Sequence, residues 1–398
     1  LGSGDAVLFK RGDVFRGSFL AQEGVTYSAY GTGAKPVICG SARNYADASV
    51  WNQLTDTNGY KLPIWVYYPN GKYGTVINAG IVAFDYDFKT GNYDVKIGNH
   101  KTYQAGKDVR ELLTGDLDFY SDLNSSTICL YSEENPGKRF SSIEIGEGNS
   151  VISGNADNVT IDNLHITLTG GHGVGMGNVS NLKVRNCVFD WIGGSVHIGH
   201  NARLGNAVQI YGSCNGFDVC NNWIYQIYDS GITGQFHNNS STDASKQSNI
   251  LANMNFHDNL IEYCYYGIEY FNLPGKDGTE RRTENVSISN NYIRKGGYGF
   301  GSIGRNSKSA ALYEVSYNGE KVTNFKTENN IFEDSMGYLI SRSGEVGNSE
   351  VSGNVNTFIQ GFGSNFSRFN KVHYTYDFSA ERVLKKMGET SFNNIYLS

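Results

Sequence analysis

Two acidic side chains, Asp229 and Glu269, have the chemistry and the expected proximity of a catalytic pair. Cleavage of a glycosidic bond needs one carboxylic acid to protonate the leaving oxygen and one carboxylate to act as nucleophile or base, about 5 to 9.5 Å apart. Glu262 is a third candidate, in the segment EYCYYGIEYF that also contains Glu269. Each has a structural alternative: Asp229 as a turn residue that caps backbone amides, Glu269 as a solvated strand residue, and Glu262 as the ion-pair partner of Arg294.

Amide, imidazole and aromatic side chains of the same region suit the recognition of a ligand rich in hydroxyl groups. Gln209 and Gln235 carry amides that pair well with hydroxyls. His197 and His200, in the segment SVHIGHN, can orient a carboxylate or bind a hydroxyl. Flat rings suit the apolar face of a pyranose, although many rings of this region must belong to a core instead. The aromatic candidates are Trp191, Tyr211, Tyr266, Tyr270 and Tyr298.

A repeat must position these residues. From about residue 158, an alternating strand ends in Asn-Asn or Asp-Asn, an apolar strand follows, and a Gly-led strand closes the unit. Such units fit one turn of a β-helix with loops of variable length. Asn tolerates a left-handed backbone and its amide can bond the same amide one coil away, so we expect a polar ladder at this bend. Alignment on Asn186, Asn222, Asn259, Asn291 and Asn330 gives spacings of 36, 37, 32 and 39 residues.

The repeat also predicts which side chains share a face, because alternate residues of a strand point to opposite sides. It places Ile232 and Ile268 in an inward column with Val174, Val196 and Phe300. The next residue of each coil then forms an outward column of Gly175, His197, Thr233, Glu269 and Gly301. Adjacent coils lie only about 4.8 Å apart, so residues distant in sequence become neighbours. Glu269 is the one carboxylate in this column, which predicts a groove around it.

The sequence therefore predicts an all-β chain whose main part is a right-handed, single-stranded parallel β-helix. Residues 1–40 are expected to form the first coils and an N-terminal cap. Residues 41–127 are expected to form a small β-rich inserted subdomain. Residues 128–375 continue the β-helix with its groove, and residues 376–398, which lose the repeat, are expected to cap the last coil.

Several segments resemble a known superfamily: GDAVLFKRGDVFRG, YSAYGTGAKPVI, DFYSDLNSSTICLYSEENPG and YDSGIT. They are similar to the bacterial carbohydrate-active β-helix proteins of the pectate-lyase-like superfamily, in its glycoside hydrolase branch. The resemblance spans residues 4 to 340 and implies an enzyme that cleaves oligosaccharides or polysaccharides outside the cytoplasm, secreted or on the cell surface. It does not specify one sugar or linkage.

The composition limits the kinds of partner that this protein is expected to bind. The net charge of −6 and pI of about 5.8 give no broad positive field for nucleic acid. No apolar run approaches the length of a spanning helix, so membrane insertion is not expected.

The six cysteines lack the spacing of a structural zinc site and are expected to be mostly buried, so no metal ligands and no cofactor are predicted, with calcium left open. The start at Leu1 suggests a missing N-terminal segment or companion domain.

Two other functions are compatible with the same fold. A polysaccharide lyase would need a base and a cation beside a uronate, which a basic set could supply; the set is Arg281, Arg282, Arg294, Lys295, Arg305 and Lys308. A non-catalytic carbohydrate-binding solenoid would need only aromatic rings and amides. Glu269 in the outward column and the negative net charge favour the hydrolase over the lyase.

Overall fold

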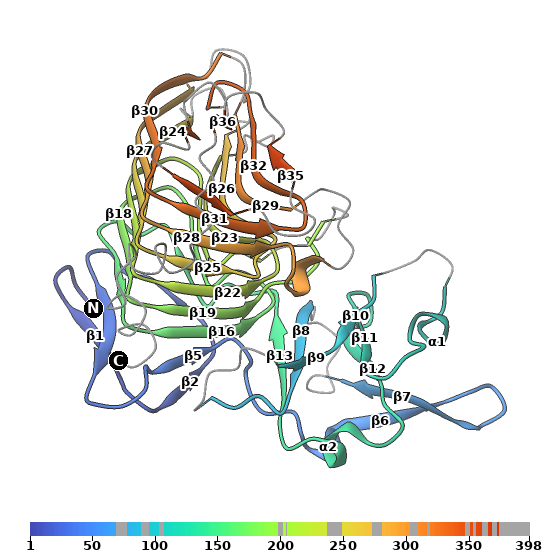
Figure 1. The fold of residues 1–398 in the computed structure, drawn as a ribbon. Helices are drawn as coiled ribbons and strands as arrows, with labels where there is room; N and C mark the ends of the chain where they lie inside the picture. Colours follow the sequence, from blue (N-terminus) through green and yellow to red (C-terminus); the bar gives the residue numbers. More distant parts are fainter. Residues whose placement is uncertain are drawn as a thin grey trace, which may run out of the picture.

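The computed structural model shows a parallel β-helix, as the repeat predicts (Figure 1). Three parallel sheets, here named A, B and C, run along the stack, and each coil up to β32 contributes one strand to each sheet in the order A, B, C. The structure describes residues 1–68, 78–88, 95–102, 107–197, 202–203, 205–236, 249–272, 281–302, 309–316, 319–346, 351–352, 356–359, 365–367 and 372–373. The predicted cap at 376–398 lies outside these residues.

The strands of the three sheets follow one another in register. Sheet A contains β1 (Ala6–Lys10), β4 (Thr26–Tyr30), β15 (Thr160–Asp162), β18 (Val179–Arg185), β21 (Cys214–Cys220), β24 (Asn249–His257), β27 (Arg281–Ser289) and β30 (Lys321–Glu328). Sheet B contains β2 (Val14–Arg16), β5 (Val37–Cys39), β16 (His165–Thr169), β19 (Val188–Ile192), β22 (Trp223–Ile227), β25 (Leu260–Glu262), β28 (Tyr292–Gly296), β31 (Ile331–Ser335) and β34 (Thr357–Ile359). Sheet C contains β3 (Phe19–Leu20), β14 (Ile152–Gly154), β17 (Val174–Met176), β20 (Val208–Tyr211), β23 (Ser230–Phe236), β26 (Tyr266–Asn272), β29 (Ala310–Val315), β32 (Tyr338–Ser343) and β35 (Asn365–Ser367).

An inserted subdomain leaves the second coil after β5 and returns at β14, so it occupies the corner between sheets B and C. It lies to one side of the stack (Figure 1). Its strands continue to Glu147, so the predicted boundary at residue 127 falls inside a strand of the insertion. The insertion has a five-stranded sheet, β10 (Asn99–His100), β11 (Asp118–Asp122), β12 (Thr127–Tyr131), β7 (Lys61–Tyr67) and β6 (Trp51–Thr55), and a three-stranded sheet, β13 (Ile143–Glu147), β8 (Ala79–Phe84) and β9 (Lys96–Ile97). The remaining short elements are η1 (Ala48–Val50), α1 (Val109–Leu112), α2 (Pro136–Arg139), η4 (Phe300–Ser302), β33 (Val351–Ser352) and β36 (Val372–His373).

The interior of the coils is a stack of apolar side chains. In sheet C the inward column is Val174, Val208, Ile232, Ile268, Leu312 and Ile340. The predicted column therefore had three members right, but Val196 and Phe300 were wrong. The chain leaves sheet B after Ile192 and enters sheet C only at Val208, and between these points Val196 forms an isolated antiparallel bridge with Arg203.

From β15 to β31, the corner between sheets A and B has two residues in each coil, and each position has its own role. The first adopts a left-handed backbone, as at Asn221 (φ 55°), and the second points inward; from Asn222 to Asn330 the second residue is Asn, and these side chains form a ladder of amides. Asn259 Nδ2 donates to Asn291 Oδ1 at 2.9 Å, and Asn222 Nδ2 donates to Asn259 Oδ1 at 3.0 Å. The predicted ladder is present, but Asn186 (φ 55°) was misaligned by one residue because it occupies the first position.

Replacing Asn259 by Ala is expected to lower the free energy of unfolding by about 1 to 3 kcal/mol, because buried amides in the coils on either side lose their partner. Urea denaturation followed by circular dichroism measures the change. The matched control is Asn215→Ala, an exposed residue of sheet A that bonds Asn253 and is expected to cost at most about 0.5 kcal/mol. Equal losses in both variants would contradict a structural role for the inner ladder.

Among the described residues, no helix is both long and apolar enough to cross a membrane.

Candidate active site at the corner between sheets B and C

Glu269 stands in an outward column of sheet C. The strand register aligns Gly175, Gln209, Thr233, Glu269, Tyr313 and Ser341. Gly175, Thr233 and Glu269 were predicted in this column. His197 and Gly301 were not members: His197 belongs to the irregular connection after β19, and Gly301 to η4. Gln209 takes the place expected for His197, which brings two predicted site residues into one row.

Neutral donors hold the carboxylate of Glu269. The Ser230 hydroxyl donates to Oε2 at 2.5 Å, and the Gln235 amide donates to the same oxygen at 2.8 Å. Glu269 is only 7% exposed, so the alternative interpretation, in which it is an ordinary solvated strand residue, is wrong. A carboxylate fixed in this way has a set orientation on the outer face of the sheet.

Asp229 lies at the turn that precedes β23, next to Ser230. Its backbone is fixed by two bonds between coils: its N–H donates to the Gly205 carbonyl at 2.9 Å, and its carbonyl accepts from Tyr266 at 3.0 Å. The side chain is half-buried. Asp229 and Glu269 are thus linked through Ser230, whose hydroxyl bonds the Glu269 carboxylate.

Asn206 connects this turn to the neighbouring coils. Its side-chain oxygen accepts from the Ser230 N–H at 2.8 Å, and its amide nitrogen donates to Gln209 Oε1 at 2.5 Å. Its backbone N–H donates to Nδ1 of His172 at 3.0 Å. Asn206, His172 and Ser230 were not predicted, because Asn206 and His172 lie in connections without periodicity and Ser230 is the first residue of its strand. The available signal was their proximity in sequence to Gln209, Val174 and Asp229.

His172 shares its surroundings with Asp229 and His197. Burial lowers the pKa of His172 to about 4; the Asp229 carboxylate opposes this shift and the His197 ring adds to it. His172 is therefore neutral at pH 7, and because Nδ1 accepts a hydrogen bond, its proton resides on Nε2. The corner thus gathers a neutral imidazole, a carboxylate and a second imidazole.

The low pKa of His172 makes the stability of the protein depend on pH. The unfolded state binds a proton at this residue below about pH 6.5, whereas the folded state does so only near pH 4. The wild type is therefore expected to lose stability as the pH falls from 6.5 to 4. In His172→Gln the decline should be shallower, which urea titrations at several pH values measure. Parallel declines in the two proteins would contradict a buried, neutral His172.

The insertion forms one wall of the corner. Asn78 accepts from the Val196 N–H at 2.9 Å through its side chain, and its carbonyl accepts from the Ser195 hydroxyl at 2.6 Å. Arg203 donates to the His100 carbonyl at 3.1 Å and lies over the ring of Tyr228. These contacts fix the connection that carries His197. Asn78 and His100 therefore help to shape a site whose other members come after residue 170.

Glu262 lies on sheet B, away from the column of Glu269. Its carboxylate accepts from Arg294 Nε at 2.6 Å and from Trp223 Nε1 at 2.8 Å, and it is almost fully buried. The structure thus contains the ion pair with Arg294 that was the alternative to a catalytic role for Glu262. Glu262 therefore has a structural role in sheet B, whereas Glu269 lies in sheet C.

The aromatic candidates separate into three groups. Tyr270 points into the coil interior, where its hydroxyl donates to Glu320 at 2.7 Å, and Trp191 is buried between the coils and the insertion, so neither can stack on a sugar. Tyr266 is buried and stacks on Tyr313. Tyr211 and Tyr298 are exposed, and Tyr211 is the direct neighbour of Gln235 in a second outward column. His200 lies outside the described residues.

The basic set expected of a lyase does not form one cluster. Arg282 lies on sheet A and pairs with Glu284, whereas Arg294 and Lys295 lie on sheet B and pair with Glu262 and Asp334. Arg305 and Lys308 lie outside the described residues. Arg282, Arg294 and Lys295 therefore serve structural ion pairs on two different sheets.

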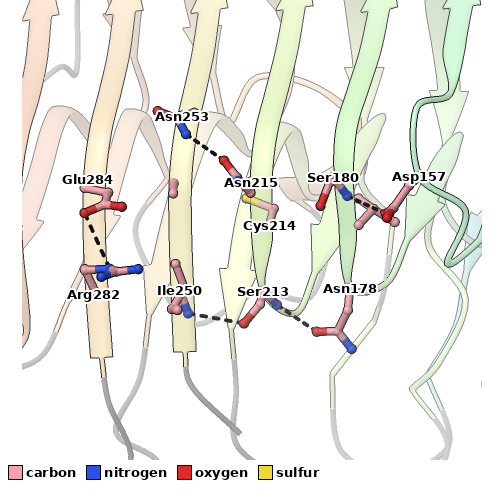
Figure 2. A pocket seen from close by; sticks show the side chains of 12 residues that line it. Asp157, Asn178, Ser180, Ser213, Cys214, Asn215, Ile250, Asn253, Arg282 and Glu284 are labelled. Carbon is pink, nitrogen blue, oxygen red and sulfur yellow. Dashed lines mark hydrogen bonds and ion pairs between the residues drawn. The ribbon is translucent and has the colours of Figure 1, made fainter.

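A groove of about 410 Å³ crosses sheet A, on a different face of the coils (Figure 2). Its polar groups bond one another between coils: Asn253 donates to Asn215 at 2.6 Å, and the Ser213 N–H donates to Asn178 at 2.8 Å. No aromatic ring is among its described lining residues. These contacts tie the coils together along this edge, away from Asp229 and Glu269.

The sequence matches no known protein family, and no curated protein matches it. Solved structures resemble the fold at low identity. One described as a glycoside hydrolase is 10% identical, with a TM-score of 0.44 and coverage of 97% of this chain and 91% of that one. The XylC complex with xylose is 12% identical (TM-score 0.44; 90% and 65% covered), and a GH136 lacto-N-biosidase from Eubacterium ramulus is 14% identical (0.39; 94% and 62%). This chain spans less than two thirds of the last two proteins, and matches at these scores do not bear on activity.

Proposed function

We propose that the protein is a glycoside hydrolase that uses Asp229 and Glu269 to cleave a bond in an oligosaccharide or polysaccharide. The observation that carries the proposal is the Glu269 carboxylate, oriented on the outer face of sheet C by Ser230 and Gln235, with Asp229 adjacent to Ser230 in the chain. The resemblance of the sequence motifs supports the same chemistry. It also extends the proposal to a secreted or cell-surface bacterial enzyme.

In the proposed reaction, one carboxylic acid protonates the glycosidic oxygen as the bond to the anomeric carbon breaks. The other carboxylate either attacks that carbon or removes a proton from the attacking water. Residues next to the two carboxylates support this reaction. Ser230 and Gln235 keep Glu269 oriented, and the Nε2–H of neutral His172 is available to a sugar oxygen or to Asp229.

Amides and an exposed ring supply the sugar contacts in this proposal. Gln209 lies in the row of Glu269, and Tyr211 lies beside Gln235 in the next outward column. An amide binds hydroxyls as donor and acceptor, and a ring at the rim stacks on the C–H face of a pyranose. The insertion closes the side of this corner that faces the first coils, where Asn78 and His100 make contacts with the connection after β19.

The products of the reaction test the proposal against the lyase. The full chain is incubated with panels of neutral and uronate-containing oligosaccharides, and both reducing ends and the absorbance of unsaturated uronate are recorded. A hydrolase yields reducing ends without that absorbance. Unsaturated products would establish β-elimination instead, and binding without any cleavage across both panels would favour a non-catalytic solenoid.

A further inference from the structure

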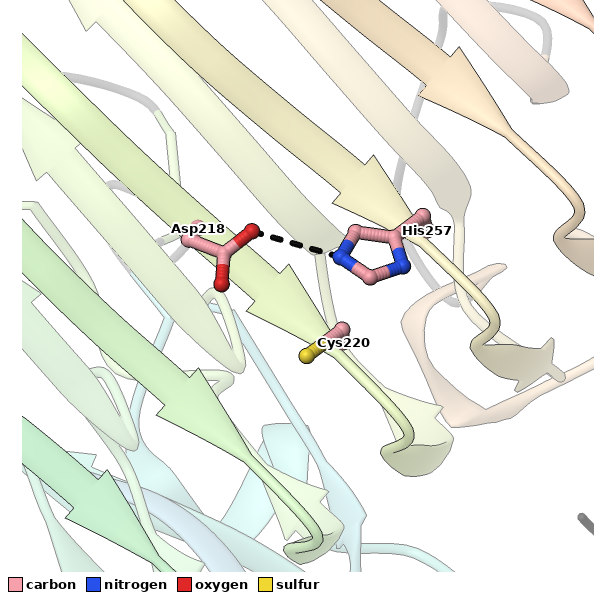
Figure 3. A group of neighbouring side chains, drawn as sticks. All are labelled: Asp218, Cys220 and His257. Atoms are coloured by element: carbon pink, nitrogen blue, oxygen red, sulfur yellow. Dashed lines mark ion pairs between the residues drawn. The ribbon is translucent and has the colours of Figure 1, made fainter.

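Asp218, Cys220 and His257 form a cluster of three potential metal ligands on the outer face of sheet A (Figure 3). Asp218 and Cys220 are alternate residues of β21, and His257 is paired directly with Cys220 on β24. One ligand atom from each residue lies within 4.8 Å of the others. This cluster lies on a different sheet from Asp229 and Glu269 and has no part in the proposed hydrolysis.

Cys220 differs from the other five cysteines, all of which the structure describes. Cys187, Cys214 and Cys264 pack in the coil interior, and Cys39 and Cys129 pack in other apolar clusters. Cys220 belongs to none of these clusters, because it follows Val219, which points inward, and therefore faces outward. Its column neighbours on either side are Arg185 and His257. Its side chain is therefore buried among polar residues of the outer face and lies outside the apolar core.

The distance between the nitrogen and oxygen donors matches a tetrahedral metal site. His257 Nε2 and Asp218 Oδ1 are 3.3 Å apart. Around a zinc ion with bonds of about 2.1 Å to nitrogen and oxygen, two ligand atoms are about 3.4 Å apart. Asn255 donates to Asp218 Oδ1 at 3.1 Å, which fixes the carboxylate and leaves a second lone pair of that oxygen for a metal.

Asp258 supplies an independent indication of a metal ligand. The Asp258 carboxylate lies 2.6 Å from His257 Nδ1 and accepts the proton of that nitrogen. This hydrogen bond turns Nε2 toward Asp218 and Cys220. A carboxylate on the second ring nitrogen is the usual support of a histidine that binds a metal. Asp258 occupies the left-handed corner position that is Asn in the described neighbouring coils; these are Asn163, Asn186, Asn221, Asn290 and Asn329. In the coil where His257 precedes this corner position, the residue is Asp258 and not Asn.

We propose that Asp218, Cys220 and His257 bind a zinc-class divalent transition metal, with Asp258 as the support of His257. A thiolate, an imidazole and a carboxylate suit Zn²⁺ and are a poor set for Mg²⁺ or Ca²⁺, which prefer oxygen ligands. Three protein ligands leave the fourth position to water. The half-exposed side chains of Asp218 (36%) and His257 (26%) give that position access to solvent. The ion would clamp β21 to β24 beside the corner of sheets A and B.

Titration of the reduced, tag-free, chelator-treated full chain with Co²⁺ and Zn²⁺ tests the proposal. One equivalent of Co²⁺ is expected to produce a thiolate-to-metal charge-transfer band, and Zn²⁺ is expected to displace it, whereas Mg²⁺ is not. Bound Zn²⁺ should also raise the melting temperature. A wild type that takes up no Co²⁺, or binds it without the thiolate band, would overturn the proposal.

Matched variants identify the ligands. Cys220→Ala should lose the charge-transfer band and bind Zn²⁺ more than about 100-fold more weakly, and Asp258→Asn about 10- to 100-fold more weakly. Cys214→Ala, on the same strand but facing the interior, should keep both the band and the affinity. If Cys220→Ala folds poorly, His257→Gln at the half-exposed surface provides the same measurement. Unchanged affinity in either of these ligand variants would refute the assignment.

Discussion

Asp229→Asn and Glu269→Gln are each expected to reduce the rate of hydrolysis by about 10²- to 10⁴-fold, the usual contribution of a positioned acid or base. Both replacements keep the size of the side chain, so the loss arises from the carboxyl chemistry and not from packing. Initial rates of reducing-end formation, measured at saturating substrate, give the effect on kcat. Circular dichroism establishes that the coils remain folded.

Glu262→Gln is the matched control for this prediction. Its carboxylate belongs to the ion pair with Arg294 on sheet B, so the variant should lose stability and keep a rate within a few-fold of the wild type. Ser230→Ala should fall between the two, because it removes one of the donors that orient Glu269 and leaves the carboxyl in place. Full activity in either Asp229→Asn or Glu269→Gln would remove that residue from the proposed pair.

Arg342→Met is expected to lower the free energy of unfolding by about 3 to 5 kcal/mol, because it leaves a buried carboxylate without its countercharge. Glu314 and Arg342 are inward neighbours on β29 and β32, and Arg342 Nε donates to Glu314 Oε2. Both are almost fully buried. Burial raises the pKa of Glu314, and Arg342 opposes that shift.

The pH dependence of Arg342→Met separates this cause from a simple loss of packing. Without the arginine, the folded-state pKa of Glu314 should rise further above its unfolded value, so the folded form binds more protons and stability falls as the pH rises. The variant should therefore be least impaired near pH 5 and most impaired near pH 8. The double variant with Glu314→Leu should recover most of the loss, since replacing a whole buried pair with apolar groups costs little. A pH-independent loss, or no recovery, would contradict the mechanism.

The fold was predictable because its signals are local and repeated. Aliphatic residues two apart, such as Val286 and Ile288, mark strands with one buried face, and the Asn pairs mark a repeated bend. Repetition corrects individual errors, so misalignment of Asn186 by one position did not affect the fold class. The row that contains Thr233 and Glu269 followed from the same periodicity.

The remainder of the site was not predictable, because it depends on connections that have no period. The segment SVHIG resembles a sheet C strand, yet Val196 bridges Arg203 and the true strand begins at Val208. Contacts such as Asn78 with Ser195 join residues more than a hundred positions apart through an insertion whose docking leaves no sequence signal. The cysteine spacing gave no metal motif either, because the coil, and not the local sequence, brings Cys220 to His257.

The two-residue corner that recurs between sheets A and B from β15 to β31 limits where this part of the architecture can vary. An added residue at Asn221 or Asn222 would shift the amide ladder and the left-handed position together, and would disturb every neighbouring coil. The corner between sheets B and C has no such constraint: it holds four residues between β16 and β17 and the whole insertion between β5 and β14. Segments can therefore be exchanged or grafted there, which would change the proposed catalytic face while the scaffold keeps its register.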